Sequence, residues 1–403
     1  MILVVAGECV IDGELRLDGR DGANVDTLNS ANFPKPGGIG VCGGGRGGAG
    51  TPSTTGTDPT GESGFGPGGT PGFGGAGGLL ACISAGFHRG SGGGGGSFAT
   101  EGDPYYKLKN AGASMVQQTG RGGLGGLQRT LAGGVAGPRI LGDRNFDNDF
   151  FGLGFDLARR RLVPGEVPGL GGGAGGGGGG DETSICPNNP AWIQDRSGAG
   201  GGGGGGALLI LAGGRIVVGA TGRISCNGGN GGGGEEVGTN GAGGGGGGGS
   251  GGMVALYSYT HIELHAHGET YANNDYDFAI SADGGIGLQG AFAGQPIAGK
   301  YPPPPVANFD ARSAGGFGGM GVIQLAVPVD GTNLDGTNTI FDDHVHVVRN
   351  GVRLTGATKQ RYIAWRGYQD RFGVGVDDSG TPTNIGDNEG DLRPSPSLLP
   401  LFR

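Results

Sequence analysis

Three uninterrupted glycine runs constrain this chain more than any other feature. They occupy residues 175–180, 200–206 and 243–249. An interior glycine costs an α-helix about 1 kcal/mol relative to alanine, so the runs disfavour helical structure. The chain has no strict Gly-X-Y period, which excludes a collagen triple helix, and no stretch of the roughly 18 apolar residues that a membrane-spanning helix needs.

The glycine runs are distributed unlike flexible linkers. Of the 106 glycines, 38 fall in residues 171–252. Linkers are the usual interpretation of such tracts, but these runs contain little Ser, Pro or Lys, recur close together and lead directly into apolar segments such as residues 207–211 and 253–257. Without side chains, extended chains can approach closely and bond backbone to backbone. We therefore predict packed polyglycine II helices, flanked by apolar cores that offset the ordering entropy.

A short internal repeat accompanies the glycine runs. Residues 2–7, 10–11 and 15–19 match residues 208–213, 216–217 and 224–228. Each copy consists of a strand, a glycine turn, a second strand, another glycine turn, a third strand and an Asp-Gly or Asn-Gly pair that favours a tight turn. We expect two similar β layers that bracket the glycine-rich middle. The predicted fold class is mainly β, with short β-strands, packed polyglycine II-like glycine-rich segments and very little helix.

The composition changes along the chain and suggests two domains. Residues 1–300 form the expected glycine-rich β or polyglycine domain, which is densest at 171–252, and residues 301–403 form a C-terminal β segment. Residues 302–305 are four consecutive prolines and mark the expected boundary. The proline-rich tail at 392–403 cannot be helical and either docks in extended form or is disordered. Only residues 153–162 resemble a helix.

Charge, cysteine content and the first residues limit the setting. The net charge of −9 argues against a nucleic-acid partner, which would favour a basic stripe. The five cysteines are widely spaced and form no CxxC pair, so we expect reduced, buried thiols rather than a zinc ribbon. The start of the chain lacks the basic region of a signal peptide. We therefore expect synthesis in the cytoplasm, with no membrane insertion.

Five of the six histidines lie in two clusters with neighbouring carboxylates. The candidate metal ligands are His261, Glu263, His265, His267, His344 and His346. The first four share one face of a strand, because side chains alternate with period two. Histidine and carboxylate suit zinc, iron or nickel. Residues two apart lie roughly 7 Å apart along a strand, so one chain makes an awkward site, whereas three chains around an axis could each donate a His-x-His pair; the alternative is an exposed polar strand face or a pH-sensitive interface.

An acidic segment resembles part of a calcium loop. Asp143, Asn145, Asp147 and Asp149 place oxygen atoms at positions 1, 3, 5 and 7, but Asn148 replaces the expected glycine. The alternative is a solvated turn. No cofactor is required by the sequence, and a transition metal or Ca²⁺ is the candidate.

The remaining candidates are aromatic. Tyr105, Tyr106, Tyr271 and Tyr276 are the expected recognition or interface residues, since tyrosine is favoured at interfaces; ordinary core and turn use is the alternative. The Gly-x-Ser-x-Gly string at 248–252 leads into a strand rather than a helix, which excludes a nucleophile elbow. We identify no catalytic residues and predict that the chain is not an enzyme.

The glycine runs within residues 171–252, each followed by short apolar strands, resemble the glycine-rich tail-fibre and fibre-tip adhesins of bacteriophages. Some of those build a polyglycine II sandwich with recognition loops at the distal end. The pairs His265/His267 and His344/His346 look like the His-x-His elements that bind metal along trimeric phage fibres. The resemblance implies a structural virion protein of a tail, baseplate or fibre, assembled in the host cytoplasm and acting in attachment or decoration.

The same resemblance implies particular partners. These are other virion proteins, further copies of the chain in a homo-oligomer such as a trimer, and a host surface glycan or protein. The main alternative is a secreted bacterial glycine-rich matrix or surface adhesin on the extracellular surface. A polysaccharide-degrading enzyme is a third alternative.

Overall fold

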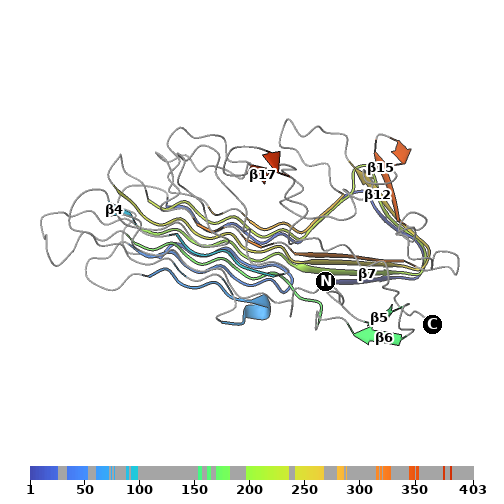
Figure 1. Ribbon diagram of the computed structural model, residues 1–403, viewed down its shortest axis with the longest axis horizontal. Helices are drawn as coiled ribbons and strands as arrows, with labels where there is room; N and C mark the ends of the chain where they lie inside the picture. Colours follow the sequence, from blue (N-terminus) through green and yellow to red (C-terminus); the bar gives the residue numbers. More distant parts are fainter. Residues whose placement is uncertain are drawn as a thin grey trace, which may run out of the picture.

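The fold is elongated, with β-strands at one end and glycine-rich segments along the rest of its length. In Figure 1 the strands β7, β12 and β15 lie towards the right, and the glycine segments extend to the left as nearly parallel, wavy traces. The computed structural model describes residues 1–25, 34–52, 60–71, 74, 77, 88–89, 92–98, 153–156, 161–164, 169–181, 197–235, 241–266, 279–285, 287, 315–316, 318–319, 321–327, 345–349, 351–353, 375–376 and 382–383.

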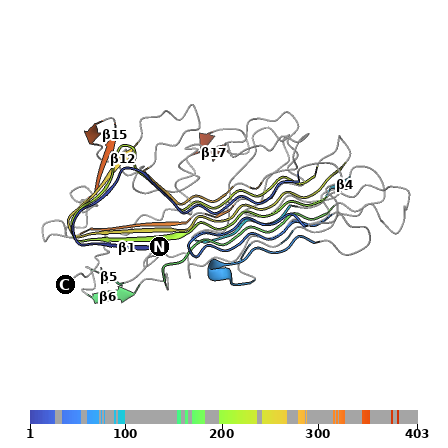
Figure 2. The ribbon, with the colours of Figure 1, turned by 180° about the vertical axis from the view of Figure 1, so that it is seen from behind.

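Three sheets with parallel strands form the β end of the molecule, and Figure 2 shows β1, β12 and β15 together at this end, seen from behind. The first sheet contains, in order, β1 (Ile2–Val5), β7 (Ala207–Ala212), β11 (Met253–Ser258) and β14 (Val322–Ala326). The second contains β2 (Cys9–Ile11), β8 (Ile216–Val218), β12 (Ile262–Ala266) and β15 (Val345–Arg349), with β16 (Val352–Arg353) antiparallel to β15 at its edge. The third contains β3 (Glu14–Arg16), β9 (Arg223–Ser225) and β13 (Ile280–Ser281).

Shorter elements complete the described parts of the chain. They are the parallel pair β4 (His88–Arg89) and β10 (Gly241–Ala242), the antiparallel pairs β5 (Leu153–Asp156) with β6 (Arg161–Pro164) and β17 (Gly375–Val376) with β18 (Pro382–Thr383), and the 3-10 turn η1 (Pro67–Gly69). The helix expected at 153–162 is wrong: Leu153–Asp156 pairs with Arg161–Pro164. Gly154 disfavours a helix there, and the cross-strand hydrogen bonds stabilise the extended form. Among the described residues η1 is the only helical turn, so the mainly β class with very little helix is confirmed.

The two repeat copies lie side by side within all three sheets. In the third sheet the pairing follows the sequence match, with Leu15 beside Ile224, but in the first two sheets it is shifted by one residue, with Ile2 beside Leu209 and Cys9 beside Ile216. The expectation of two separate layers around the glycine-rich middle is therefore wrong. Paired residues of neighbouring parallel strands face the same side of a sheet, so Leu3 and Ile210 pack in one core, and pairing the copies extends that core instead of building two.

Two further sets of strands continue this arrangement. β11, β12 and β13 each add a third strand to one of the three sheets. β14 adds a fourth strand to the first sheet, and β15 adds a fourth strand to the second. The strand expected for the first histidine cluster is present as β12. The expected domain boundary at 300/301 lies outside the described residues, and strands from both sides of it are neighbours in the same sheet.

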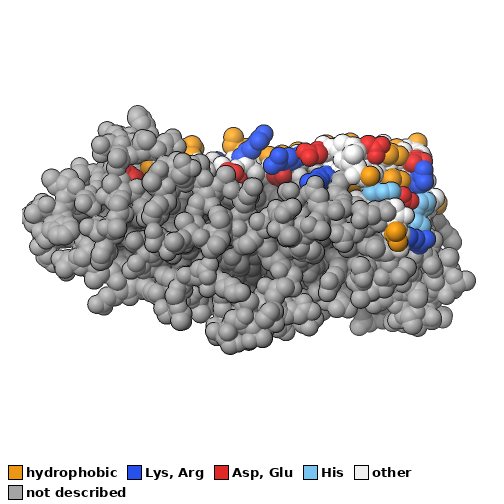
Figure 3. All heavy atoms as spheres, turned by 90° about the horizontal axis from the view of Figure 1, so that it is seen from above, with side chains coloured by type: hydrophobic (Ala, Val, Ile, Leu, Met, Phe, Trp, Pro, Cys, Tyr) orange, Lys and Arg blue, Asp and Glu red, His pale blue; other side chains and the backbone are white. Residues whose placement is uncertain are grey.

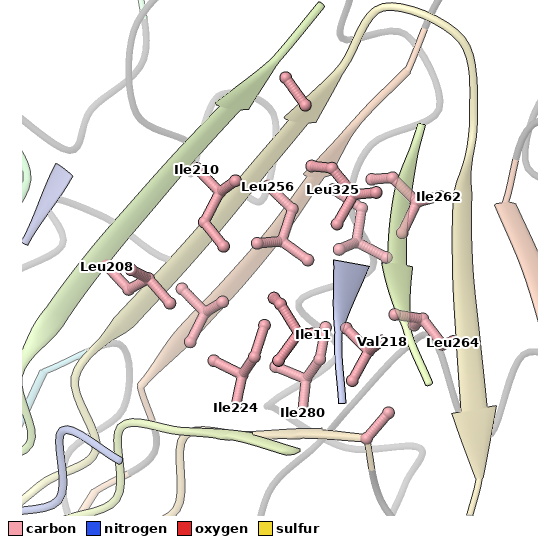
Figure 4. Close-up of a cluster of buried hydrophobic side chains, with 14 of the residues drawn as sticks. Ile11, Leu208, Ile210, Val218, Ile224, Leu256, Ile262, Leu264, Ile280 and Leu325 are labelled. Atoms are coloured by element: carbon pink, nitrogen blue, oxygen red, sulfur yellow. The ribbon is translucent and has the colours of Figure 1, made fainter. Parts of the chain in front are cut away.

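The three sheets enclose the main hydrophobic core. Ile210, Ile216, Ile224 and Leu256 are at most 1% exposed, and Figure 4 shows that side chains from all three sheets point towards one another. Full burial of a side chain of this size contributes about 1.5–3 kcal/mol. A second cluster, which includes Phe98 and Met253, covers the opposite face of the first sheet.

The glycine segments continue from the strands and bond to one another through their backbones. In the segment 197–206, the N–H groups of Gly204, Gly205 and Gly206 donate to three different neighbouring segments. Their acceptors are the carbonyls of Gly45, Ser250 and Leu17, at 2.8 to 2.9 Å. The three preceding residues donate to the same three segments, at the carbonyls of Gly48, Gly247 and Arg20. The donors therefore cycle among the neighbours with a period of three residues.

The carbonyl groups of this segment reach other neighbours. Those of Gly202 and Gly205 accept hydrogen bonds from residues 176 and 173, and those of Gly200 and Gly203 from residues 232 and 229. Three residues per turn is the periodicity of polyproline II and polyglycine II helices. The hydrogen bonds of this segment repeat with the same period and reach neighbours on several sides.

The close approach of these segments requires glycine. A Cβ atom added at Gly201 would overlap the carbonyl oxygen of Gly176, and one at Gly204 would overlap that of Gly173. Both contacts are with the backbone, so no side chain can rotate to make room. The segments of the array therefore lie too close together for any residue larger than glycine at these positions.

The cysteines differ in their surroundings. Cys226 is buried, Cys9 is half-buried and Cys42 is exposed, and all three are free thiols; Cys82 and Cys186 lie outside the described residues. Burial raises the pKa of the Cys226 thiol. Within the described ranges, no helix has the length and apolar character needed to cross a membrane.

Candidate metal centre

Polar side chains gather on the outer face of the second sheet, along β12. Ile262 and Leu264 point into the core, whereas Glu263 and His265 are half-buried on the other face. The predicted alternation of this strand is therefore confirmed. Figure 3 shows histidine side chains in pale blue among charged groups at one end of the surface that carries the described residues.

Strand pairing brings the second histidine cluster beside the first. Glu263 is paired with His346 of β15, and the ring centroids of His261 and His346 are 5.2 Å apart. One ligand atom from each of His261, Glu263 and His346 lies within 4.8 Å of the other two. Two imidazole nitrogens and a carboxylate oxygen form a donor set typical of zinc and other divalent transition metals.

A further histidine holds the carboxylate of this group. His265 Nε2 and Glu263 Oε1 are 2.5 Å apart, and the two side chains are 27% and 24% exposed. When its Nε2 carries a proton, His265 donates this hydrogen bond, and the contact is an ion pair when the ring is charged. His265 therefore restricts the orientation of Glu263.

An ion pair lies near the histidines on the same sheet. Arg215, which precedes β8, contacts Glu8, which precedes β2, at 2.8 Å. The Glu8 carboxylate raises the pKa of Arg215, and the charge of Glu263 adds a smaller effect in the same direction. The carboxylate of Glu263 is thus influenced by the positive charge of Arg215 and by its contact with His265.

The structure places the predicted metal residues in three groups. It brings His261, Glu263 and His346 together within one chain, and His265 contacts Glu263. His267 and His344 lie outside the described residues. Histidines two apart on one strand are too far apart to share an ion easily, but residues paired on adjacent strands are only about 4.8 Å apart. One chain can therefore assemble this group without the threefold axis that the sequence suggested.

The other predicted sites fall on parts of the chain that are not described. These are the calcium-like loop, with Asp143, Asn145, Asp147 and Asp149, and the recognition residues Tyr105, Tyr106, Tyr271 and Tyr276.

Sequence reasoning missed a row of polar side chains at the edge of the glycine array. Asp18, Asp21 and Asn24 accept hydrogen bonds of 2.7 to 2.8 Å through Oδ1. The donors are the backbone N–H groups of Asn227, Asn230 and Gly233. The spacing of three matches the period of the array, and the Asp-Gly-x-Asp-Gly-x-Asn string at 18–24 was the available signal. These side chains thus supply acceptors to the neighbouring segment.

A second missed group joins two segments of the array near its surface. Arg46 donates two hydrogen bonds to the Glu62 carboxylate, at 2.7 and 3.0 Å, and its guanidinium lies 4.4 Å from the centre of the Phe65 ring. Glu62 also accepts a bond from the N–H of Ala49. The Arg46 hydrogen bond lowers the pKa of Glu62. No sequence period connects these residues, so pattern analysis had no signal for them.

No protein-family model, curated protein or solved structure matches the chain. Its function is therefore argued from its own geometry.

Proposed function

We propose that this chain is a structural virion protein of a bacteriophage tail, baseplate or fibre, where it acts in host attachment or decoration. The observation that carries the proposal is the array of glycine segments, each hydrogen-bonded to several neighbours and continuous with a three-sheet core. Such a body resists bending, because any displacement of one segment breaks bonds to several others. Stiffness along one long axis suits a component that holds a receptor-binding surface away from a particle (Figure 1).

The chain path supports a display role for the end of the array remote from the sheets. Described segments reach that end at residues 25, 181, 235 and 287, and the chain re-enters the array at residues 34, 197, 241 and 315. The connection at 182–196 contains Trp192, Asn188 and Asn189. Tryptophan is a frequent binding hot spot, and asparagine offers both donors and acceptors. We propose that residues of this kind recognise a host glycan or protein.

The sheet edges support association with other chains. Among the described strands, β1 and β2 lie at the sheet edges, and their outward side chains Ile2, Val4 and Val10 are 60%, 75% and 51% exposed. Edge strands with exposed apolar side chains are prone to pair with another chain. The proposal therefore includes a homo-oligomer or docking to another virion protein, with no nucleic acid, no membrane insertion and no catalytic activity assigned to the chain.

Immunogold electron microscopy tests this function. An antibody raised against the purified chain is applied to phage particles whose genome carries its gene, with pre-immune serum as the control. We expect specific labelling of the tail or its fibres. Label on the bacterial surface or in the secreted matrix, without labelled particles, would contradict the proposal and favour the bacterial adhesin.

A further inference from the structure

We propose that His261, Glu263 and His346 form a binding site for a zinc-type divalent transition metal that joins β12 to β15. This inference is independent of the virion role. Glu263 lies on β12, His261 directly precedes that strand, and His346 lies on β15, where the register pairs it directly with Glu263. They share the outer face of the second sheet, where they do not contribute to the apolar core.

The donor atoms are already close to a coordinating arrangement. All three lie within 4.8 Å of one another, whereas donors about 2.0 Å from a tetrahedral zinc ion are separated by roughly 3.3 Å. Side-chain rotation has to close this difference, because strand pairing holds the backbones of β12 and β15 in register. Three protein donors leave a fourth position for water or for a donor from another molecule.

The donor chemistry selects the type of ion. Two imidazole nitrogens favour zinc, nickel or copper, whereas calcium takes six to eight oxygen ligands. His265 acts as the outer partner of the site, because its bond to Oε1 of Glu263 orients the carboxylate and leaves the second oxygen for the metal. Outer partners of this kind typically change metal affinity by about 10–100-fold.

Metal binding at this position would fasten β15 to the rest of the sheet. β15 is covered at its outer side by β16, a strand of only two residues. An ion held by β12 and β15 together binds the paired state and not the separated strands, so it shifts the local opening equilibrium towards pairing. The expected consequence is slower hydrogen exchange in residues 345–349 when the ion is present.

Titration of the full-length, EDTA-treated protein tests the site. Calorimetry with Zn²⁺ and absorption spectroscopy with Co²⁺ should show one ion per chain and a Co²⁺ band typical of nitrogen and oxygen donors. His346→Gln and Glu263→Gln should each weaken binding at least about 100-fold, and His265→Gln about 10-fold. His88→Gln, on β4 of a different sheet, is the matched control and should bind as the wild type does.

Two results would overturn the proposal. One is the absence of Zn²⁺ binding by folded wild-type protein at micromolar concentrations. The other is wild-type affinity in His346→Gln and Glu263→Gln, with loss of binding in His267→Gln or His344→Gln instead. Far-UV circular dichroism and hydrogen exchange in β11 check that each variant is folded. The substitutions lie on a half-exposed face, and His261→Gln provides a third variant if either of the others fails to fold.

Discussion

The carboxylate of Asp18 accepts a 2.8 Å hydrogen bond from the backbone N–H of Asn227, a residue 209 positions later in the chain. The bond lies directly after the paired strands β3 and β9, where both repeat copies pass from sheet into glycine segment. Asn227 then uses its own side chain to accept a bond from the N–H of Asp283, at 2.7 Å. Asp18 and Asn227, which follow corresponding strands, therefore link the three neighbouring segments where the third sheet meets the glycine array.

Removal of this acceptor should destabilise the junction. We expect Asp18→Ala to lower the free energy of unfolding by about 1–3 kcal/mol, because the N–H of Asn227 loses a charged acceptor. Urea denaturation followed by circular dichroism measures the effect. Asp18→Asn keeps an acceptor oxygen and should cost clearly less. Equal losses in both variants would assign the effect to the ion pair between Asp18 and Arg16, which both substitutions remove, and not to this hydrogen bond.

A single methyl group inside the glycine array should be more damaging than one on a surface turn. Gly201→Ala forces a Cβ against the backbone of Gly176, and we expect a loss at or above the upper end of the ~1–3 kcal/mol typical of overpacking. Gly7→Ala and Gly13→Ala are matched controls, because a Cβ at either position meets no atom of the described residues within 4 Å. Thermal unfolding compares the three variants. A Gly201→Ala protein as stable as the controls would contradict the close packing described above.

The ion pair of Glu62 should make stability depend on acid pH. Because the pKa of Glu62 is lowered in the folded protein, its contribution is present above the unfolded pKa of about 4.3 and is lost as the pH falls through the folded value. Both side chains are about 40% exposed, so solvent screening keeps the effect small.

Urea midpoints of the wild type and Glu62→Gln between pH 7 and pH 2.5 measure this dependence. The gap between the two proteins should be largest near neutral pH and shrink below pH 4. A gap that stays constant over the whole range would exclude Glu62 as its source. Arg46→Gln, which removes the other partner, should reproduce the behaviour of Glu62→Gln.

The parts of the structure that follow a period could be predicted from the sequence, and the parts that depend on distant contacts could not. Alternation in residues 261–267 predicts the outward face of Glu263 and His265, and the repeat predicts matching strands. Neither pattern specifies which strands become neighbours. The pairing of Glu263 with His346, and the side-by-side pairing of the two repeat copies, are therefore seen only in the structure. The β5–β6 hairpin was missed for the same reason, because local propensity over 153–162 is weak and pairing decides the outcome.

Hydrogen exchange in the central glycine run tests the central claim most directly. If Gly200–Gly206 form a packed array, their amides exchange slowly, with protection comparable to that of Leu208 and Ile210 in the adjoining strand β7, since their N–H groups are bonded inside the protein. Mass spectrometry or NMR of the native protein resolves the two regions. Protection in β7 with exchange in 200–206 at the rate of an unstructured peptide would contradict the account and return these glycines to the role of flexible linkers.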